Sequence, residues 1–143
     1  MKITKGNVLA APCGLYCGEC SAYKAKDNPV LLNALVEKGI EREKLPCLGC
    51  RQGKGECPAI NCECETYKCV ENRDIDFCFE CTEFPCSRLN PSVDKATALP
   101  HNIKIYNLCY IKQHGVTKWL EKASEIQERY FKGKMIIGKG PQL

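Results

Sequence analysis

The cysteines constrain this chain more than any other feature of its sequence. Of its 13 cysteines, all but Cys109 fall between residues 13 and 86. Leu, Ile, Val and Phe together supply only about 22% of the 143 residues, close to the level at which chains stop forming a hydrophobic core of their own. A chain of this kind needs disulfides or bound metal to hold its fold.

The start of the chain favours metal over disulfides. The segment MKITKGNVLAAPC contains no apolar run of signal-peptide length, and no later stretch is apolar enough to span a membrane. We therefore expect a cytoplasmic protein without membrane association. Thiols stay reduced in the cytoplasm, so cysteines at this density indicate metal ligands. Their odd number also fits a disulfide framework poorly.

Three C-x2-C units organise the cysteine-rich part: Cys17/Cys20, Cys47/Cys50 and Cys78/Cys81. Two intervening residues allow a single turn to present both sulfurs to one ion. The segments CGECSAY and CFECTEF share a pattern around the first and third units. This is either a weak internal repeat or the effect of a tight metal-binding turn. In CLGC, Gly49 lets the backbone turn so that its amides point at a thiolate.

The remaining cysteines supply further ligands. Twelve cysteines divide into three four-cysteine sites, but one or two sites with spare thiols are equally compatible with the spacing. We therefore predict two or three zinc ions per chain, with the pairing of the cysteines left open. To complete the site of Cys17 and Cys20 we choose Cys86 first. It ends the segment FCFECTEFPC, whose pattern matches the one around Cys17 and Cys20. The predicted metal ligands are Cys13, Cys17, Cys20, Cys47, Cys50, Cys57, Cys62, Cys64, Cys69, Cys78, Cys81 and Cys86.

An iron–sulfur cluster is the alternative cofactor, because such clusters are also held by four thiolates. The ferredoxin run C-x2-C-x2-C-x3-C-P is absent, and the C-x2-C units lie far apart among charged residues, which favours zinc. The C-x3-C-x2-C spacing of residues 13–20 is also the one with which radical enzymes hold an open cluster. The chain is too short for the barrel that such an enzyme needs, about 250 residues when complete, so we set this interpretation aside.

The pattern of apolar residues predicts the remaining organisation. Residues 1–90 form the cysteine-rich metal-binding region, with a helix near 29–38 that Asn28 caps. Residues 91–132 form a C-terminal helical segment of the same domain, and residues 133–143 a flexible tail. We thus predict a small metal-stabilised domain of irregular cysteine-rich loops and short hairpins with a few α-helices.

The C-terminal segment is predicted to contain a helical pair, at about 101–113 and 115–131. In the first helix Cys109 falls near the apolar face with Leu108 and Ile111, so we predict a small buried side chain rather than a ligand. In the second, an apolar face recurs at helical spacing. Its residues are Val116, Trp119, Leu120, Ala123, Ile126 and Tyr130.

The cysteine motifs resemble those of a prokaryotic cysteine-rich family of unknown function. The resemblance lies in CGLYCGEC, CLGCR, the CETYKC spacing, FCFECTEFPC and GVTKWLE, and covers about residues 10–125. It implies a zinc-binding protein with no established activity, with Cys57 and Cys62 less firmly placed than the other ligands. Many members carry a further Cys-Pro-x-Cys unit after the Trp helix, and this chain has ASEIQERYFKGK there.

Other residues give weaker signals. The net charge is +4, and the excess of lysine and arginine lies beyond residue 100, where a solvated helix face is favoured over a nucleic-acid surface. His101 and His114 are not needed as ligands where cysteine is in surplus, and no catalytic motif is present. We expect a non-enzymatic interaction or assembly module that binds an unknown protein partner. An iron–sulfur redox or electron-transfer protein is the alternative.

Overall fold

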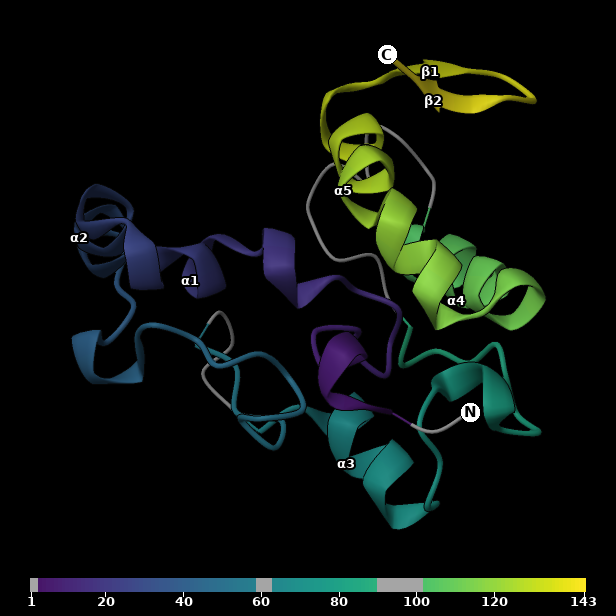
Figure 1. Ribbon diagram of the computed structural model, residues 1–143, viewed down its shortest axis with the longest axis horizontal. Coiled ribbons are helices and arrows are strands. Elements are labelled where there is room, and N and C mark those ends of the chain that lie inside the picture. Colours follow the sequence, from purple (N-terminus) through teal and green to yellow (C-terminus); the bar gives the residue numbers. More distant parts are fainter. Residues whose placement is uncertain (1–2, 59–62, 90–101) are drawn as a thin grey trace.

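Short helices joined by loops make up the described part of the chain, with one small hairpin near its C-terminal end. The computed structural model describes residues 3–58, 63–89 and 102–143. Figure 1 shows α1 and α2 together on one side of the molecule, and α4 and α5 together on the other. The α-helices are α1 (Ser21–Lys24), α2 (Pro29–Glu37), α3 (Glu65–Asn72), α4 (Ile103–His114) and α5 (Val116–Lys132). Single 3-10 turns are η1 (Lys5–Asn7), η2 (Cys17–Glu19), η3 (Ala25–Asp27), η4 (Arg42–Lys44) and η5 (Cys78–Glu80).

Helix α2 begins and ends where its sequence signals predict. The Asn28 side chain accepts a hydrogen bond from the Leu31 backbone N–H at 3.0 Å, and Pro29 occupies the first helical position. Both features satisfy or remove N–H groups that a helix start leaves unpaired. Gly39 follows the helix with a φ of 96°. The predicted helix at 29–38 is therefore confirmed.

The predicted C-terminal helical pair is also confirmed, as α4 and α5, although His101 lies outside the described residues. The apolar face of α5 is buried as predicted, except that Leu120 is only partly buried. The prediction for Cys109 was wrong, because this residue is exposed on α4. Asn107 is buried instead, since its amide donates a hydrogen bond to the Gly14 carbonyl at 2.7 Å.

The buried residues form two hydrophobic clusters. The larger one joins α4 and α5 to the loops that carry Ala10 and Phe77, and Trp119 is fully buried within it. The smaller one lies between α1, η3 and α2 and consists of Ala22, Ala25 and Leu35. Residues 21–46, between the first two C-x2-C units, form the lobe that holds this smaller cluster. We call this segment the α1–α2 lobe.

Hairpins are placed differently from the prediction. In the described part of the cysteine-rich region, only single bridges occur, Ala10 with Tyr16 and Glu56 with Glu63. The hairpin lies instead within residues 133–143, where we predicted a flexible tail. There β1 (Lys134–Ile136) pairs antiparallel with β2 (Gly140–Gln142). Among the described helices, none has the length and apolar character needed to cross a membrane.

Candidate metal centre

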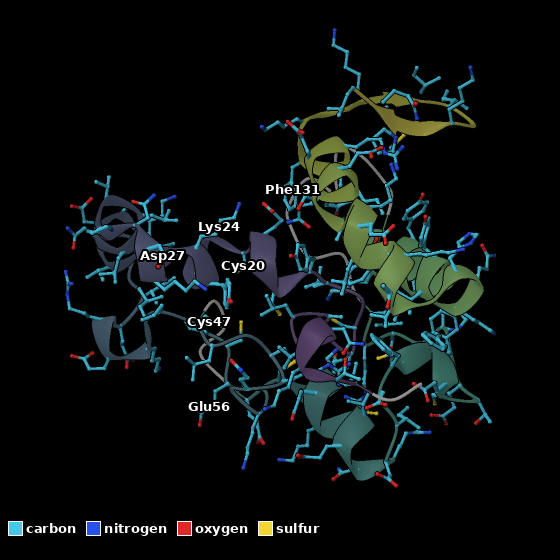
Figure 2. The ribbon with its side chains drawn as sticks, viewed as in Figure 1. Cys20, Lys24, Asp27, Cys47, Glu56 and Phe131 are labelled. Carbon is cyan, nitrogen blue, oxygen red and sulfur yellow. The ribbon has the colours of Figure 1, made fainter. Side chains whose placement is uncertain are left out.

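The first and second C-x2-C units face each other, although 33 residues separate Cys17 from Cys50 along the chain. The Cys50 backbone N–H points at Cys17 Sγ, with 3.5 Å between nitrogen and sulfur. The Cys47 N–H donates to the Ala22 carbonyl at 2.9 Å, which holds the second unit against the start of the α1–α2 lobe. Figure 2 shows Cys20 and Cys47 at the inner end of that lobe. We call Cys17, Cys20, Cys47 and Cys50 the first thiol group.

The second unit of the first thiol group forms a tight turn around a cysteine sulfur. The Gly49 N–H donates to Cys47 Sγ at 3.4 Å, as the CLGC pattern predicts. Gly49 has a φ of 89°, and a Cβ there would lie 3.2 Å from a Leu9 methyl carbon. Both the turn and the close approach to Leu9 therefore favour glycine.

The thiols of this group are close enough to influence one another. The pKa of Cys17 is raised to about 12, mainly by burial; the neighbouring Cys13, Cys20 and Cys47 contribute to the rise, and the Cys50 N–H opposes it. Burial likewise raises the pKa of Cys47, with Cys20 adding to the rise. Crowded, desolvated thiols lose their protons readily only when a metal ion or another positive charge stabilises the thiolates.

A second set of cysteines surrounds the third C-x2-C unit. Burial raises the pKa of Cys78 to about 12, and the nearby Cys13, Cys86, Cys69 and Cys81 contribute to the rise. A cavity of about 600 Å³ is lined by Cys69 of α3, by Cys78 and Cys81 of the η5 turn, and by Cys86. We call these four lining residues the second thiol group. Cys86 thus lies with Cys78, and not with the site of Cys17 that we expected it to complete.

The η2 and η5 turns share their local backbone. In each, the second cysteine of the unit donates its N–H to the carbonyl of the first, at 3.0 Å in η2 and 3.2 Å in η5. In each, the glutamate before that cysteine also donates its N–H to the carbonyl of the aromatic residue before the unit, at 3.3 Å in η2 and 3.0 Å in η5. The chain then diverges, because η2 leads into helix α1 while η5 leads into a loop. The shared sequence pattern thus corresponds to a shared turn, which fits both a weak internal repeat and a turn imposed by metal binding.

Cys13, Cys57 and Cys64 form a third, looser set near Cys50. Burial raises the pKa of Cys50, and Cys13, Cys17, Cys64 and Cys57 add to the rise. Cys13 also influences Cys17 and Cys78, so it lies between the thiol groups. The predicted ligand Cys62 lies outside the described residues.

Arg51 connects the segments around the first thiol group. Its Nε donates to the Ala10 carbonyl at 2.7 Å and its Nη2 donates to the Asp76 carbonyl at 2.8 Å. The guanidinium carbon also lies 5.0 Å from the centre of the Phe77 ring. Sequence reasoning missed this role, although the arginine stands directly after CLGC.

The donor set fits a thiophilic metal ion such as zinc. All-cysteine coordination by paired C-x2-C turns is typical of structural zinc sites, and backbone N–H groups directed at the sulfurs stabilise thiolate charge. None of the described cysteines forms a disulfide. The sulfurs lie near one another without surrounding a common point. In the described ranges, no three Cys, His, Asp or Glu side chains have the geometry to hold a metal ion.

These features define a small cysteine-rich helical domain whose thiols are brought together by turns from distant parts of the chain. The chain belongs to a family of proteins of unknown function, DUF3795, whose model matches residues 9–91. The resemblance to a cysteine-rich family of unknown function is thereby confirmed. The match ends before α4, so it does not include the helical pair. No curated protein and no solved structure matches the chain.

Proposed function

We propose that this protein binds zinc through all-cysteine sites that hold its segments together, and that it acts in the cytoplasm as a module for interaction or assembly with a protein partner. One observation carries the zinc proposal. The turns of the first thiol group, from two distant segments, face each other with a backbone N–H from one directed at a sulfur of the other.

A bound ion would supply stability that the α1–α2 lobe lacks. The smaller cluster contains only three buried residues, Ala22, Ala25 and Leu35, and two of them are alanines with little apolar surface to bury. Cys20 and Cys47 pack against the same cluster and stand at the two ends of the lobe. Zinc held by the first thiol group would therefore close the lobe at its base.

Two lysines of α5 are paired with glutamates, which weakens the case for a nucleic-acid partner. Lys122 pairs with Glu125 at 3.0 Å, and Lys132 pairs with Glu128 at 3.2 Å. Lysines that are paired along an exposed helix face offer less positive charge to phosphates than a continuous basic patch.

Metal analysis of anaerobically purified protein tests the proposal. We expect a colourless protein that contains zinc, binds no iron or sulfide, and loses structure when a strong chelator removes the metal. The double variant Cys17→Ser/Cys50→Ser should bind at least one zinc ion fewer per chain. Cys109→Ser is the matched control, because Cys109 is exposed on α4, and it should leave the zinc content unchanged.

Two outcomes would overturn the proposal. A brown protein with broad visible absorbance, bound iron and acid-labile sulfide would identify the alternative, an iron–sulfur redox or electron-transfer protein. A protein that contains neither metal and resists the chelator would exclude both.

A further inference from the structure

The second thiol group differs from the first in having a cation in direct contact with one of its sulfurs. Arg73 stands at the C-terminal end of α3, one helical turn after Cys69. Its Nη1 donates to Cys81 Sγ at 3.1 Å. The guanidinium is also close enough to Cys69 for that thiol, after Glu83 and Cys81, to contribute to the raised pKa of Arg73. The Arg73 side chain thus links the end of α3 to a sulfur at the end of the η5 turn.

The contact of Arg73 with Cys81 is reinforced from two sides. The Glu83 backbone N–H donates to Cys81 Sγ at 3.3 Å, so this sulfur accepts two hydrogen bonds. The Glu83 carboxylate in turn pairs with Arg73 Nη2 and orients the guanidinium. A neutral thiol is a weak acceptor, whereas a thiolate accepts strongly from a guanidinium. The arrangement therefore gives Cys81 Sγ two N–H donors, one of them on a cation.

The first thiol group has a nearby arginine that is used differently. The Arg51 nitrogens donate to the backbone carbonyls of Ala10 and Asp76. Arg51 therefore ties chain segments together, while Arg73 contacts a sulfur directly. The two thiol groups are not equivalent in their charge environment.

Charge explains why a cation at the sulfurs matters. Four thiolates around one divalent zinc ion leave a net charge of about −2 on the centre. A guanidinium that donates to one of the four sulfurs and lies near a second offsets part of this charge and helps to hold the ligands in place. The second thiol group lines an open cavity, and Cys86 is exposed, so this site is accessible to reagents in solution.

We infer that Cys69, Cys78, Cys81 and Cys86 form a separate zinc centre, and that Arg73 is its built-in counter-cation. This inference rests on the proposed function, because it assumes that the protein binds zinc. It adds which four cysteines share the exposed site and which side chain determines how tightly that site retains its ion.

The ligand assignment is tested by zinc content. Cys78→Ser/Cys81→Ser should bind one zinc ion fewer per chain than the wild-type protein, while Cys109→Ser should match the wild type. Circular dichroism of both variants checks that α4 and α5 are still formed. If the double variant keeps the full zinc content, the assignment is wrong.

The role of Arg73 is tested by affinity and by release rate, measured with a chromophoric chelator on the intact zinc-loaded protein. Arg73→Gln should weaken the binding of one zinc ion by about 10- to 100-fold, the usual effect of removing an outer-shell partner, and should speed its transfer to the chelator. Arg73→Lys should restore part of the affinity, because it returns the charge without the planar fork. Glu83→Gln, which removes only the orienting carboxylate, should have a smaller effect than Arg73→Gln.

The outcomes separate this inference from the proposed function. A wild-type protein without zinc would overturn both. A protein whose zinc is lost in Cys17→Ser/Cys50→Ser but not in Cys78→Ser/Cys81→Ser would support the proposed function and overturn this inference. Equal affinities for the wild type and Arg73→Gln would leave the site in place and exclude Arg73 as its counter-cation.

Discussion

At the scale of single residues, the residues between Cys13 and Cys20 pack the cysteine-rich region against the C-terminal helices. Gly14 lies so close to α4 that a Cβ would be 2.7 Å from the Lys104 carbonyl oxygen. Tyr16 packs edge-on against Trp119, with 5.9 Å between ring centres. Gly18 leaves room for Tyr16, whose hydroxyl would be 2.7 Å from a Cβ at that position. The CGLYCGEC segment thus positions thiols and also joins the cysteine-rich region to α4 and α5.

Gly14→Ala should destabilise the protein more than an ordinary glycine replacement. The new Cβ meets a backbone oxygen that cannot rotate away, and Gly14 also has a φ of 89°. The left-handed backbone costs an alanine about 1–2 kcal/mol, and the overpacking adds about 1–3 kcal/mol. The measurement is urea unfolding of the zinc-loaded protein, followed by circular dichroism.

Gly39→Ala is the matched control for this prediction. Gly39 has a similar φ of 96°, but nothing lies within 4 Å of a Cβ placed there. It should therefore show the cost of the backbone conformation alone. If the two variants have the same free energy of unfolding, close packing of Gly14 on α4 does not contribute to stability.

The sequence identified the cysteines as the residues that matter but not their supporting partners. Ligand type can be inferred from density and spacing, because C-x2-C chemistry is local. Arg51 and Arg73 act through contacts that depend on the folded chain; Arg51 belongs to the CLGCR motif, but that position does not reveal which groups it contacts. Cys109 was misplaced for a related reason, since the buried face of α4 is determined partly by the hydrogen bond from Asn107 to Gly14.

At the scale of elements, helices with local signals could be predicted and the grouping of thiols could not. The bounds of α2, α4 and α5 follow from caps, glycines and apolar periodicity, all of which act within a few residues. The proximity of Cys17 and Cys50, in contrast, depends on the path of the 33-residue segment that brings the second unit back to the first. Residues 133–143 show a further limit, because their lysine-rich composition conceals a glycine-containing hairpin.

The α1–α2 lobe should respond to metal removal more than the rest of the molecule. Among the described residues its cluster has three buried members, whereas the cluster around Trp119 has eleven. After zinc is removed by a chelator, we expect faster amide hydrogen exchange in α1 and α2, with α4 and α5 changing less. Hydrogen exchange followed by mass spectrometry resolves these segments.

A variant locates the effect of metal removal within the first thiol group. Cys17→Ser/Cys50→Ser should reproduce the faster exchange of α1 and α2 without any chelator, and Cys109→Ser should not. Uniform acceleration over all described helices after metal removal would mean that the α1–α2 lobe has no separate dependence on the metal.

At the scale of the whole molecule, two separate hydrophobic clusters and several thiol groups share one short chain. Cys13 and Cys78 border the larger cluster, while Cys20 and Cys47 border the smaller one. The thiol groups therefore lie where the two clusters meet the intervening loops. Metal binding at these places would couple parts of the fold that have few apolar contacts of their own.

This arrangement predicts opposite pH dependences for the metal-free and zinc-loaded protein. In the metal-free protein, burial raises the pKa of Cys17 and of Cys78 from 9.0 to about 12. Above about pH 9 the unfolded chain loses thiol protons that the folded chain retains, so the free energy of unfolding falls as pH rises. In the zinc-loaded protein the ligands are already deprotonated, so this loss should be absent.

Acidification should act in the other direction. Below neutral pH, protons compete with zinc for the thiolates, so the stability of the zinc-loaded protein should fall as pH is lowered, while the metal-free protein is unaffected by this competition. Anaerobic urea unfolding of both forms from about pH 5 to 11 measures the two profiles. If the two forms show the same dependence on pH, the thiols of Cys17 and Cys78 do not exchange their protons for metal. These two cysteines would then not be zinc ligands.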